Sequence, residues 1–424
     1  MGAQSSRAGK HMLKQGGRGK EKTCCSGSMR RLMKQCHCPS RAGKHMLKQG
    51  GRGKEKTCCS GSMRRLMKQC HCPSRRLLVP LLSLALILLA LLKLRLFHTY
   101  QKPIEVSVDP IYRERVRTYV QEVLRNECRP SFARQRTRAD HSRSTPVAQP
   151  FLYKNTILND EIFKYPPPFG FMDMQKNLKE VLKLLPSSEE SSGGRECRRC
   201  VVVGNGGILK GLGLGPLLNQ FNVIIRLNSG PVKDFIADVG NRTSIRMTYP
   251  EGCPKVWEDT DSDLKLVAVI YKSVDFLWLR AMITETAISL WDWLFFWQKV
   301  PVRVPIDVSQ FLLLNPEIIR ETALDLLHFP TPRKRFWGWD QNVPTLGVSA
   351  LNLATYVCDE VSIAGFGYNL SQRNAPLHYY DDLTMTAMLK ESMHDVHTER
   401  VFLKHLIMSG TVTDLTGGIH CNFC

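Results

Sequence analysis

The stretch CRRCVVVGNGGILKGLGLG (residues 197–215) decides how the rest of the chain is interpreted. Three valines run directly into a glycine-rich loop, which is how a buried parallel strand leads into a phosphate-binding turn. The glycines fit neither common fingerprint. Leu209 stands where G-x-G-x-x-G requires its third glycine, and no G-x-x-x-x-G-K-[ST] occurs. We therefore expect a strand and a ligand-binding loop that holds neither a dinucleotide nor a P-loop triphosphate.

Strand-like and helix-like patterns alternate beyond this stretch. Branched apolar runs at 222–230, 264–272 and 360–368 predict further buried strands. The alternation predicts an α/β domain with a Rossmann-like, largely parallel sheet and helices on both faces. Ligands of such sheets bind at the carboxyl ends of the strands, near the switch point, and the loop that opens at Gly204 lies at such an end.

Helices and loops are predicted around these strands. Residues 109–127 and 311–329 carry apolar side chains at helical spacing, although Pro316 lies within the second pattern. Residues 129–150 are rich in Arg, Ser and Pro, which is typical of a loop.

The positive charge is concentrated at the start of the chain. The 424 residues carry a net +21, and residues 1–76 hold 20 Lys and Arg against Glu21 and Glu55, a net +18. The remaining 348 residues carry only +3, so the composition does not predict a nucleic-acid groove. Residues 6–41 also repeat without change at 40–75, an offset of 34 residues. The many Gly and Lys residues of this repeat predict a disordered tail.

An uncharged apolar run, LLVPLLSLALILLALL at 77–92, predicts a membrane span. A helix that extends to Phe97 is about 31 Å long at 1.5 Å per residue, because the basic residues near its end can snorkel. The basic residues before the span predict a cytosolic N-terminus and a lumenal chain beyond it, a type II arrangement. The sequons at Asn241 and Asn369 agree with glycosylation in a lumen. A cleaved signal peptide is the alternative.

The chain therefore divides into four predicted parts. They are a basic cytosolic tail over 1–76, a transmembrane signal-anchor over 77–97, a short stem over 98–108 and a lumenal domain over 109–424. Whether Gly2 of the opening MGAQSS is myristoylated stays open.

Four blocks of the lumenal part resemble, in order, the motifs of the animal sialyltransferases. They are residues 200–232, residues 343–368, HYYD at 378–381 and HDVHTE at 394–399. The first looks like the long motif of the family, the second like its short motif, and the last is an H-x-x-x-x-E pattern. The resemblance implies a sialyltransferase variant of the GT-A fold, an inverting transfer of sialic acid from CMP-sialic acid without a metal, and a place in the Golgi membrane.

The donor that the resemblance implies also explains the glycine pattern, because one bridging phosphate needs no pyrophosphate cradle. Gly213 and Gly215 are expected to serve as tight turns only. The donor-site residues that the resemblance implies are Asn205, Asn228, Thr345, Gly347, Gly365 and Tyr379, with Tyr249 for the donor or acceptor sugar.

The resemblance assigns the catalytic roles to two histidines and a glutamate. His394 is expected to act as the general base, since histidine titrates near ambient pH. His378 is expected to stabilise the departing phosphate. On a helix, Glu399 would lie about 140° from His394 and would orient the local backbone instead of touching the imidazole. His397 is the rival histidine, but it does not match the spacing of the family.

The resemblance also implies disulfides. It pairs Cys200 with Cys358 and, less directly, Cys128 with Cys197. Three further cysteines beyond the predicted anchor are left without an assigned partner, namely Cys253, Cys421 and Cys424.

Four shorter segments indicate the acceptor, and three alternative functions stay open. The segments RMTYPEG, SVDFLWLRAM, WLFFWQKV and DLTGGI resemble the family members that act on the glycolipid lactosylceramide. Another galactoside is the first alternative. A metal-dependent transferase that uses Asp259, Asp261 and Asp263 is the second, and an anchored binding protein without turnover is the third. Self-association and association with other glycosyltransferases stay open.

Overall fold

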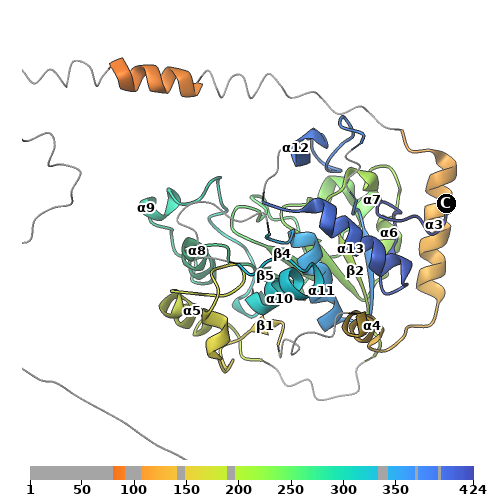
Figure 1. Cartoon of the computed structure of the whole chain (residues 1–424), viewed down its shortest axis with the longest axis horizontal. Coiled ribbons are helices and arrows are strands. Elements are labelled where there is room, and N and C mark those ends of the chain that lie inside the picture. Colours follow the sequence, from red (N-terminus) through yellow and green to blue (C-terminus); the bar gives the residue numbers. More distant parts are fainter. Residues whose placement is uncertain are drawn as a thin grey trace, which may run out of the picture. The chain divides into compact units, whose positions relative to one another are not determined.

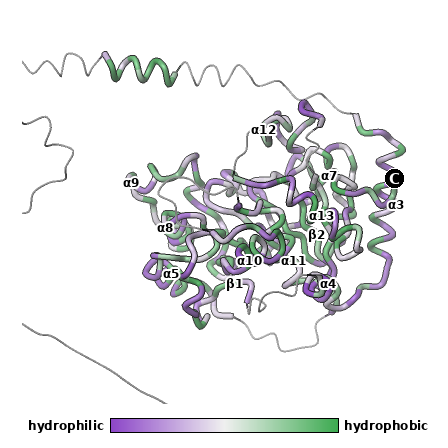
Figure 2. Tube along the Cα trace, in the orientation of Figure 1, coloured by the Kyte–Doolittle hydropathy of each residue, from purple (hydrophilic) through white to green (hydrophobic). Residues whose placement is uncertain are grey.

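The computed structural model describes residues 80–90, 107–140, 149–188, 196–332, 342–367, 371–389 and 393–424. The predicted tail and most of the predicted stem lie outside these ranges. Of the predicted anchor, residues 80–90 are described, and they form a helix with exposed leucines that is hydrophobic along its length (Figure 2). Within the described ranges, none of the helices combines the length and the apolar character needed to cross a membrane.

The remaining described residues, from 107 onward, are built on one eight-stranded sheet with the order β1-β6-β5-β4-β3-β2-β7-β8. Every neighbouring pair is parallel except β1 and β6. The mixed α/β fold with a largely parallel sheet is therefore confirmed. The strands are β1 Phe151–Leu152, β2 Arg199–Val203, β3 Val223–Leu227, β4 Ile245–Thr248, β5 Lys265–Ala268, β6 Phe311–Leu314, β7 Glu360–Ala364 and β8 Thr413–Asp414.

The switch point of this sheet lies between β2 and β7. The chain runs from β2 through β3, β4 and β5 to β6 in one direction and then returns to place β7 on the other side of β2. Five residue pairs join β2 to β7, from Arg199 with Glu360 to Val203 with Ala364. The glycine loop after β2 therefore opens at the position where ligands of such sheets bind.

Helices cover both faces of the sheet, as Figure 1 shows. Alternate strand residues point to opposite faces, so Cys200 and Val202 join one core while Val201 and Val203 join another. On the first face lie α4 Phe132–Asp140, α10 Pro316–Glu321, α11 Leu346–Val357 and α13 Val396–Met408. On the opposite face lie α3 Pro110–Arg125, α5 Gln175–Leu182, α6 Gly215–Leu218, α7 Ile236–Val239 and α8 Ser273–Ile283. Two short helices complete the set, α9 Leu290–Trp293 and α12 Thr386–Leu389.

The prediction of one helix over 311–329 is wrong at its start. Residues Phe311–Leu314 form β6 and are buried on both faces, since Phe311 and Leu312 belong to different cores. The helix begins only at Pro316, where the side chain of Asn315 accepts a hydrogen bond from the amide of Glu317. A short apolar run before a proline has no periodicity that distinguishes a strand from a helix.

The prediction of a loop over 129–150 is also wrong in part, because α4 occupies Phe132–Asp140. Ala133 and Thr137 lie on one face of this helix and are buried. Arg134 stacks over the ring of Tyr356 at 3.5 Å and is ion-paired with Glu321. Tertiary contacts with α10 and α11 therefore stabilise a segment whose composition favours a loop.

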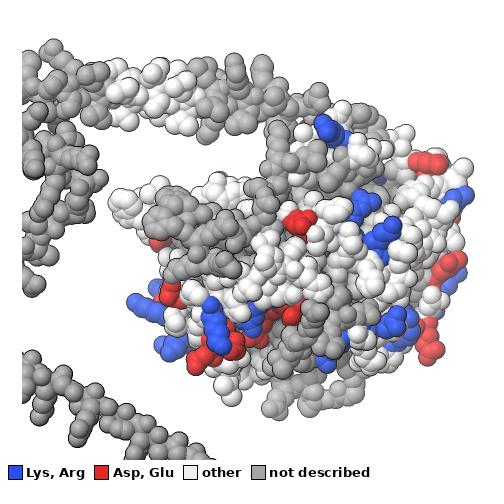
Figure 3. Space-filling model, in the orientation of Figure 1, with Lys and Arg blue, Asp and Glu red and all other residues white. Residues whose placement is uncertain are grey.

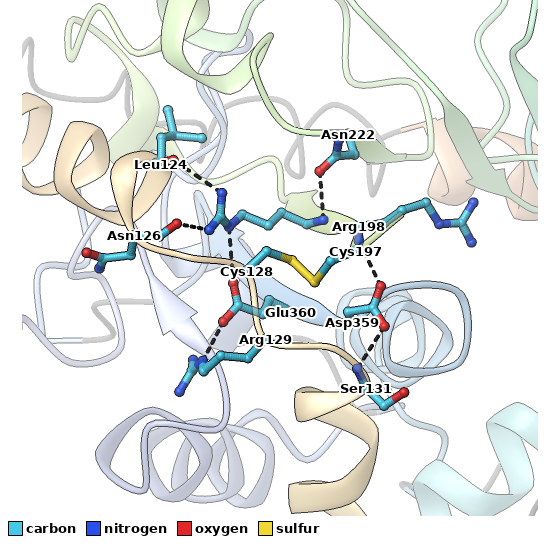
Figure 4. The surroundings of a disulfide bond; sticks show 11 residues. Leu124, Asn126, Cys128, Arg129, Ser131, Cys197, Arg198, Asn222, Asp359 and Glu360 are labelled. Atoms are coloured by element: carbon cyan, nitrogen blue, oxygen red, sulfur yellow. Dashed lines mark hydrogen bonds and ion pairs between the residues drawn. A yellow bond between two sulfur atoms is a disulfide. The ribbon is translucent and has the colours of Figure 1, made fainter. Parts of the chain in front are cut away.

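The two disulfides that the resemblance implied are present. Cys128 is bonded to Cys197, and Cys200 is bonded to Cys358. Figure 4 places the first bond beside the start of β2 and β7, where the Asp359 carboxylate accepts from the amides of Ser131 and Arg198. Of the cysteines left unassigned, Cys421 and Cys424 bond to each other, whereas Cys253 is a buried thiol.

Candidate active site

Several of the predicted donor residues follow neighbouring strands at one edge of the sheet. Asn205 follows β2, Asn228 follows β3, Tyr249 follows β4 and Gly365 follows β7. Parallel strands place all their carboxyl ends at one edge, so the fold gathers residues that are far apart in the sequence.

The loops after β2 and β7 are pressed together at the switch point. The Gly206 amide donates to the Gly365 carbonyl at 3.0 Å. A Cβ atom on Gly204 or Gly206 would lie 2.6 or 2.5 Å from that same oxygen. Glycine is therefore required at both positions for the loops to meet.

The second half of the glycine loop already holds an anion of the protein itself. The amides of Gly211 and Gly213 each donate to the Asp238 carboxylate at 2.8 Å, and both glycines have positive φ. Gly215 lies against the backbone of α7 at Ile236, where a Cβ atom would overlap. Gly211 and Gly213 therefore serve a turn, as predicted for Gly213. Gly215 begins α6 and serves helix packing instead of the predicted tight turn. The first half of the loop remains for a ligand.

Asn205, His378 and Tyr379 come together through the backbone. The Tyr379 amide donates to the Asn205 carbonyl at 3.1 Å, and Gly206 forms an isolated antiparallel bridge with His378. The hydroxyl of Tyr379 donates to the Pro231 carbonyl at 2.7 Å, and its side chain is buried. Tyr379 thus holds the loop after β3 in place, and its hydroxyl is engaged within the protein.

His378 is paired with a carboxylate that the sequence reasoning did not assign. Its Nδ1 lies 2.8 Å from Oδ2 of Asp381, and its ring stacks on Tyr380 with centroids 5.1 Å apart. A carboxylate accepts hydrogen bonds only, so Nδ1 carries a proton and the Asp381 carboxylate fixes the orientation of the ring. The H-x-x-D spacing within HYYD (378–381) could have indicated this pairing from the sequence alone.

Asn228 is held in a left-handed conformation by a buried arginine. It has φ +50°, and its carbonyl accepts from Nη1 of Arg246 at 2.7 Å. Arg246 also bonds the Gly230 carbonyl at 3.2 Å and forms a buried ion pair with Asp259. Sequence reasoning missed Arg246, although a charged residue inside a buried strand indicates a buried partner.

The aspartates of the D-x-D pattern have structural partners. Burial alone would raise the pKa of Asp259, but the bonds from Arg246 and Thr243 lower it below its ordinary value. Asp261 accepts from the Thr243 amide at 2.7 Å, and Asp263 lies on the surface. The carboxylates of Asp259 and Asp261 are thus engaged with Thr243, just before β4, and with Arg246 within β4. The described residues contain no group of three or more side chains suited to hold a metal.

Tyr249 lies among aromatic side chains at the same edge. Its ring is 5.2 Å from that of Tyr271 and 6.3 Å from that of Trp297. Burial raises the pKa of Tyr271, and the nearby Tyr249, Asp275 and Glu399 add to the rise. Tyr249 and Tyr271 thus form an aromatic pair at this edge.

His394 precedes α13 and contacts the start of the short motif. Its Nδ1 lies 2.7 Å from the Val343 carbonyl oxygen. A carbonyl only accepts, so Nδ1 carries the proton, and the neutral ring has its lone pair on Nε2. The backbone therefore selects the tautomer in which Nε2 can accept a proton. His397, on the first turn of α13, is exposed.

Glu399 orients the same segment without contacting His394, as its spacing predicts. Its carboxyl is buried and accepts from both the amide and the hydroxyl of Thr345 at 2.6 Å. Thr345 is the N-cap of α11. A Cβ atom on Gly347 would lie 2.9 Å from the Phe366 ring, which also borders Gly204. Residues 343–347 are thereby connected to the switch point.

Of the predicted glycosylation sites, Asn241 is exposed, and its side-chain oxygen accepts from Asn219. Asn369 lies outside the described residues.

Two substitutions of Glu399 separate the effect of its hydrogen-bond acceptor from the effect of its charge. Glu399→Gln keeps an acceptor for the Thr345 amide, and we expect near-parental stability at neutral pH. Glu399→Ala leaves that amide without its acceptor, and we expect the free energy of unfolding to fall by about 1–3 kcal/mol. Unfolding midpoints of both variants check this, and equal losses would contradict it.

The contact between Glu399 and Thr345 also predicts that the stability of the protein depends on pH. Burial raises the pKa of Glu399 to about 7 from its ordinary 4.5, although the bonds from Thr345 oppose the rise. The folded protein therefore binds this proton more tightly than the unfolded chain. Its contribution to stability is complete below about pH 4.5 and is lost as the pH rises through about 7. Glu399→Gln should flatten this part of a plot of unfolding midpoint against pH.

A parallel sheet with polar side chains at its carboxyl edge, together with a histidine whose Nε2 can accept a proton, is the arrangement of an α/β enzyme with its ligand site at that edge. Residues 151–411 match the model of glycosyltransferase family 29 (sialyltransferase). The chain belongs to this family, the sialyltransferases.

Named relatives and a solved structure agree with this membership. The chain is 49% identical over 320 residues to lactosylceramide alpha-2,3-sialyltransferase of Pan troglodytes, covering 74% of this chain and 88% of that one. It is 36% identical over 298 residues to CMP-N-acetylneuraminate-beta-1,4-galactoside alpha-2,3-sialyltransferase of Homo sapiens, covering 69% and 77%. A crystal structure of a mammalian sialyltransferase has the same fold, with a TM-score of 0.54 at 23% identity over 68% of this chain and 98% of that chain.

Proposed function

We propose that this protein transfers sialic acid from CMP-sialic acid to the 3-hydroxyl of the terminal galactose of lactosylceramide, with inversion. The family membership supports the donor, and the activity named for the relatives at 46% to 49% identity supports the acceptor. The observation that carries the chemistry is the bond from Nδ1 of His394 to the Val343 carbonyl.

In this proposal, Nε2 of His394 takes the proton of the galactose 3-hydroxyl. The hydroxyl oxygen forms the new bond to the anomeric carbon of sialic acid. The bond from that carbon to the phosphate oxygen breaks, and CMP leaves with the electron pair. His378, with its ring oriented by Asp381, lies in the segment that pairs with the Asn205 loop and is suited to donate a hydrogen bond to the phosphate.

The remaining donor contacts in this proposal come from the carboxyl edge. Asn205 and Asn228 contact the nucleotide, and Arg246 positions Asn228 through its carbonyl. The contacts of Asp259 and Asp261 favour a reaction without a metal at that loop over a metal-dependent transferase. We further propose a type II protein of the Golgi membrane, anchored by residues 77–97, with the catalytic domain in the lumen.

The test is a transfer assay with the full chain in detergent. Labelled CMP-sialic acid is offered with lactosylceramide, a glycoprotein galactoside or galactosylceramide. We expect product chiefly on lactosylceramide, with a rate that excess EDTA does not change. Loss of activity with EDTA would overturn the metal-free reaction, and preference for another galactoside would overturn the acceptor.

A further inference from the structure

A group of large apolar side chains is exposed next to the candidate site. It lies on α9 and the turn that follows. We call it the 290–297 patch, and it consists of Leu290, Trp291, Leu294, Phe295 and Trp297, whose exposed fractions run from 66% to 86%.

The patch is held in place from below. Trp293 and Phe296, three residues apart, turn inward to the core beneath, and their rings meet at 6.2 Å. Lys272 lies 5.1 Å above the ring of Phe296. Because Trp293 and Phe296 point inward, the side chains of the patch point outward. The local fold therefore accounts for the exposure of the patch.

The composition of the patch differs from an ordinary protein surface. Single exposed apolar residues are common, but contiguous groups of them mark interaction sites. Asp292 is the only charged residue between Ile288 and Gln298. On the face drawn in Figure 3, the described atoms at the position of α9 are almost all uncharged.

The patch continues directly into the site. The ring of Trp297 is 6.3 Å from that of Tyr249, which follows β4 at the carboxyl edge. The next residue, Gln298, donates to the Glu251 carbonyl at 2.6 Å in the same loop. A partner bound to the patch is therefore brought beside the edge where Asn228 and Tyr249 lie.

We propose that the 290–297 patch inserts into the surface of the lipid bilayer that carries the acceptor. The proposal rests on the proposed function, in which the acceptor is a membrane glycolipid whose sugar projects from the bilayer. Tryptophan, phenylalanine and leucine are the side chains that bury in the boundary between headgroups and acyl chains, and exposed Lys299 follows them. Insertion there holds the carboxyl edge at the height of the lipid sugars.

A second copy of this chain fits the patch less well. Stable protein interfaces involve about 20–30 residues on each side, whereas the patch spans eight. A bilayer sets no such requirement, because a few apolar side chains suffice to hold a surface that is already tethered.

The first test uses the full chain reconstituted in phosphatidylcholine vesicles with lactosylceramide, and methyl lactoside as the soluble acceptor. The variant is Leu294→Ser with Phe295→Ser. We expect its kcat/KM on the vesicle acceptor to fall by about 10-fold or more, because each buried large apolar side chain contributes a factor of that order. Transfer to methyl lactoside should stay at the parent rate.

The matched control removes two exposed apolar side chains elsewhere. Ile111→Ser with Ile157→Ser changes one residue on α3, which lies across the domain from α9 (Figure 1), and one in the loop after β1. This variant should keep both rates. Equal losses on both acceptors for the patch variant, or no loss on either, would overturn the proposal.

The second test is independent of activity. Trp291→Phe keeps the patch apolar and removes one fluorophore, so the difference between parent and variant reports Trp291 alone. Brominated phosphatidylcholine should quench this difference signal. If Trp291 is quenched only by aqueous iodide, insertion is excluded while the proposed function can stand. If it is quenched by the lipid but lactosylceramide is not sialylated, the proposed acceptor fails while docking stands. A patch variant that turns a sedimenting dimer into a monomer would assign the surface to self-association and overturn bilayer docking.

Discussion

Replacement of His394 by alanine should lower kcat for sialyl transfer by about 10²–10⁴-fold, the usual effect of removing a general base. The loss belongs to kcat because the proton leaves the acceptor in the transition state and not on binding. Donor affinity and the unfolding midpoint should stay close to those of the parent. Single-turnover transfer and equilibrium donor binding measure these quantities separately.

The contact with Val343 allows a sharper version of this experiment. His394→Asn places an amide N–H where Nδ1 lies, so it can keep the bond to the Val343 carbonyl while it removes the basic Nε2. We expect the asparagine variant to lose kcat as much as the alanine variant does. If His394→Asn is active, the residue positions residues 343–345 and is not the base.

Two other histidines provide controls. His397→Ala changes an exposed side chain on the same helix and should leave kcat near the parent value. His378→Ala should lower both kcat and donor affinity, because the role proposed for His378 is to stabilise the departing phosphate. An inactive His397→Ala beside an active His394→Ala would show that the catalytic histidine was wrongly assigned.

Removal of Asp259 should have the largest effect on stability. Asp259→Ala leaves the Arg246 guanidinium, only 2% exposed, without its counter-charge. Breaking a buried ion pair on one side costs about 3–5 kcal/mol. We expect the thermal midpoint of the chain to fall by about 10 °C on that basis. A change within the error of the melting curve would contradict the buried pair.

A double variant separates stability from function. Arg246→Met with Asp259→Leu replaces both charges with apolar side chains and should recover much of the midpoint. The carbonyls of Asn228 and Gly230 still lose their donor, so affinity for the donor substrate should stay reduced. Full recovery of both properties would show that Arg246 does not position Asn228.

The strands at the centre of the sheet were predictable because their sequences are dense in branched apolar residues. The runs around Val201, Ile224 and Val361 are buried on both faces and have no competing interpretation. The run at Phe311 had a competing interpretation, since four apolar residues before Asn315 and Pro316 suit either a strand or a helix. Helix α4 could not be predicted, because its stability comes from partners far along the chain such as Glu321 and Tyr356.

The candidate site also has a part that the sequence could predict and a part that it could not. Residues such as Asn205 and His394 were located from motifs, which are local in the sequence. Their partners are not local, because Val343 lies 51 residues from His394 and Glu399 lies 54 residues from Thr345. Only the fold could identify the tautomer of His394 and Thr345 as the partner of Glu399.

The bond between Cys200 and Cys358 has a consequence for how this protein must be produced. Cys358 ends α11, the helix whose other end carries Thr345 and Gly347, so the bond fixes that helix to β2 at the end remote from the ligand. A helix of twelve residues is about 18 Å long and transmits a shift at one end to the other. Material made in a reducing cytoplasm can contain the correct sheet and still present Thr345 out of place. The quality of a preparation is therefore better judged by titrating its free thiols than by its solubility or its circular dichroism spectrum.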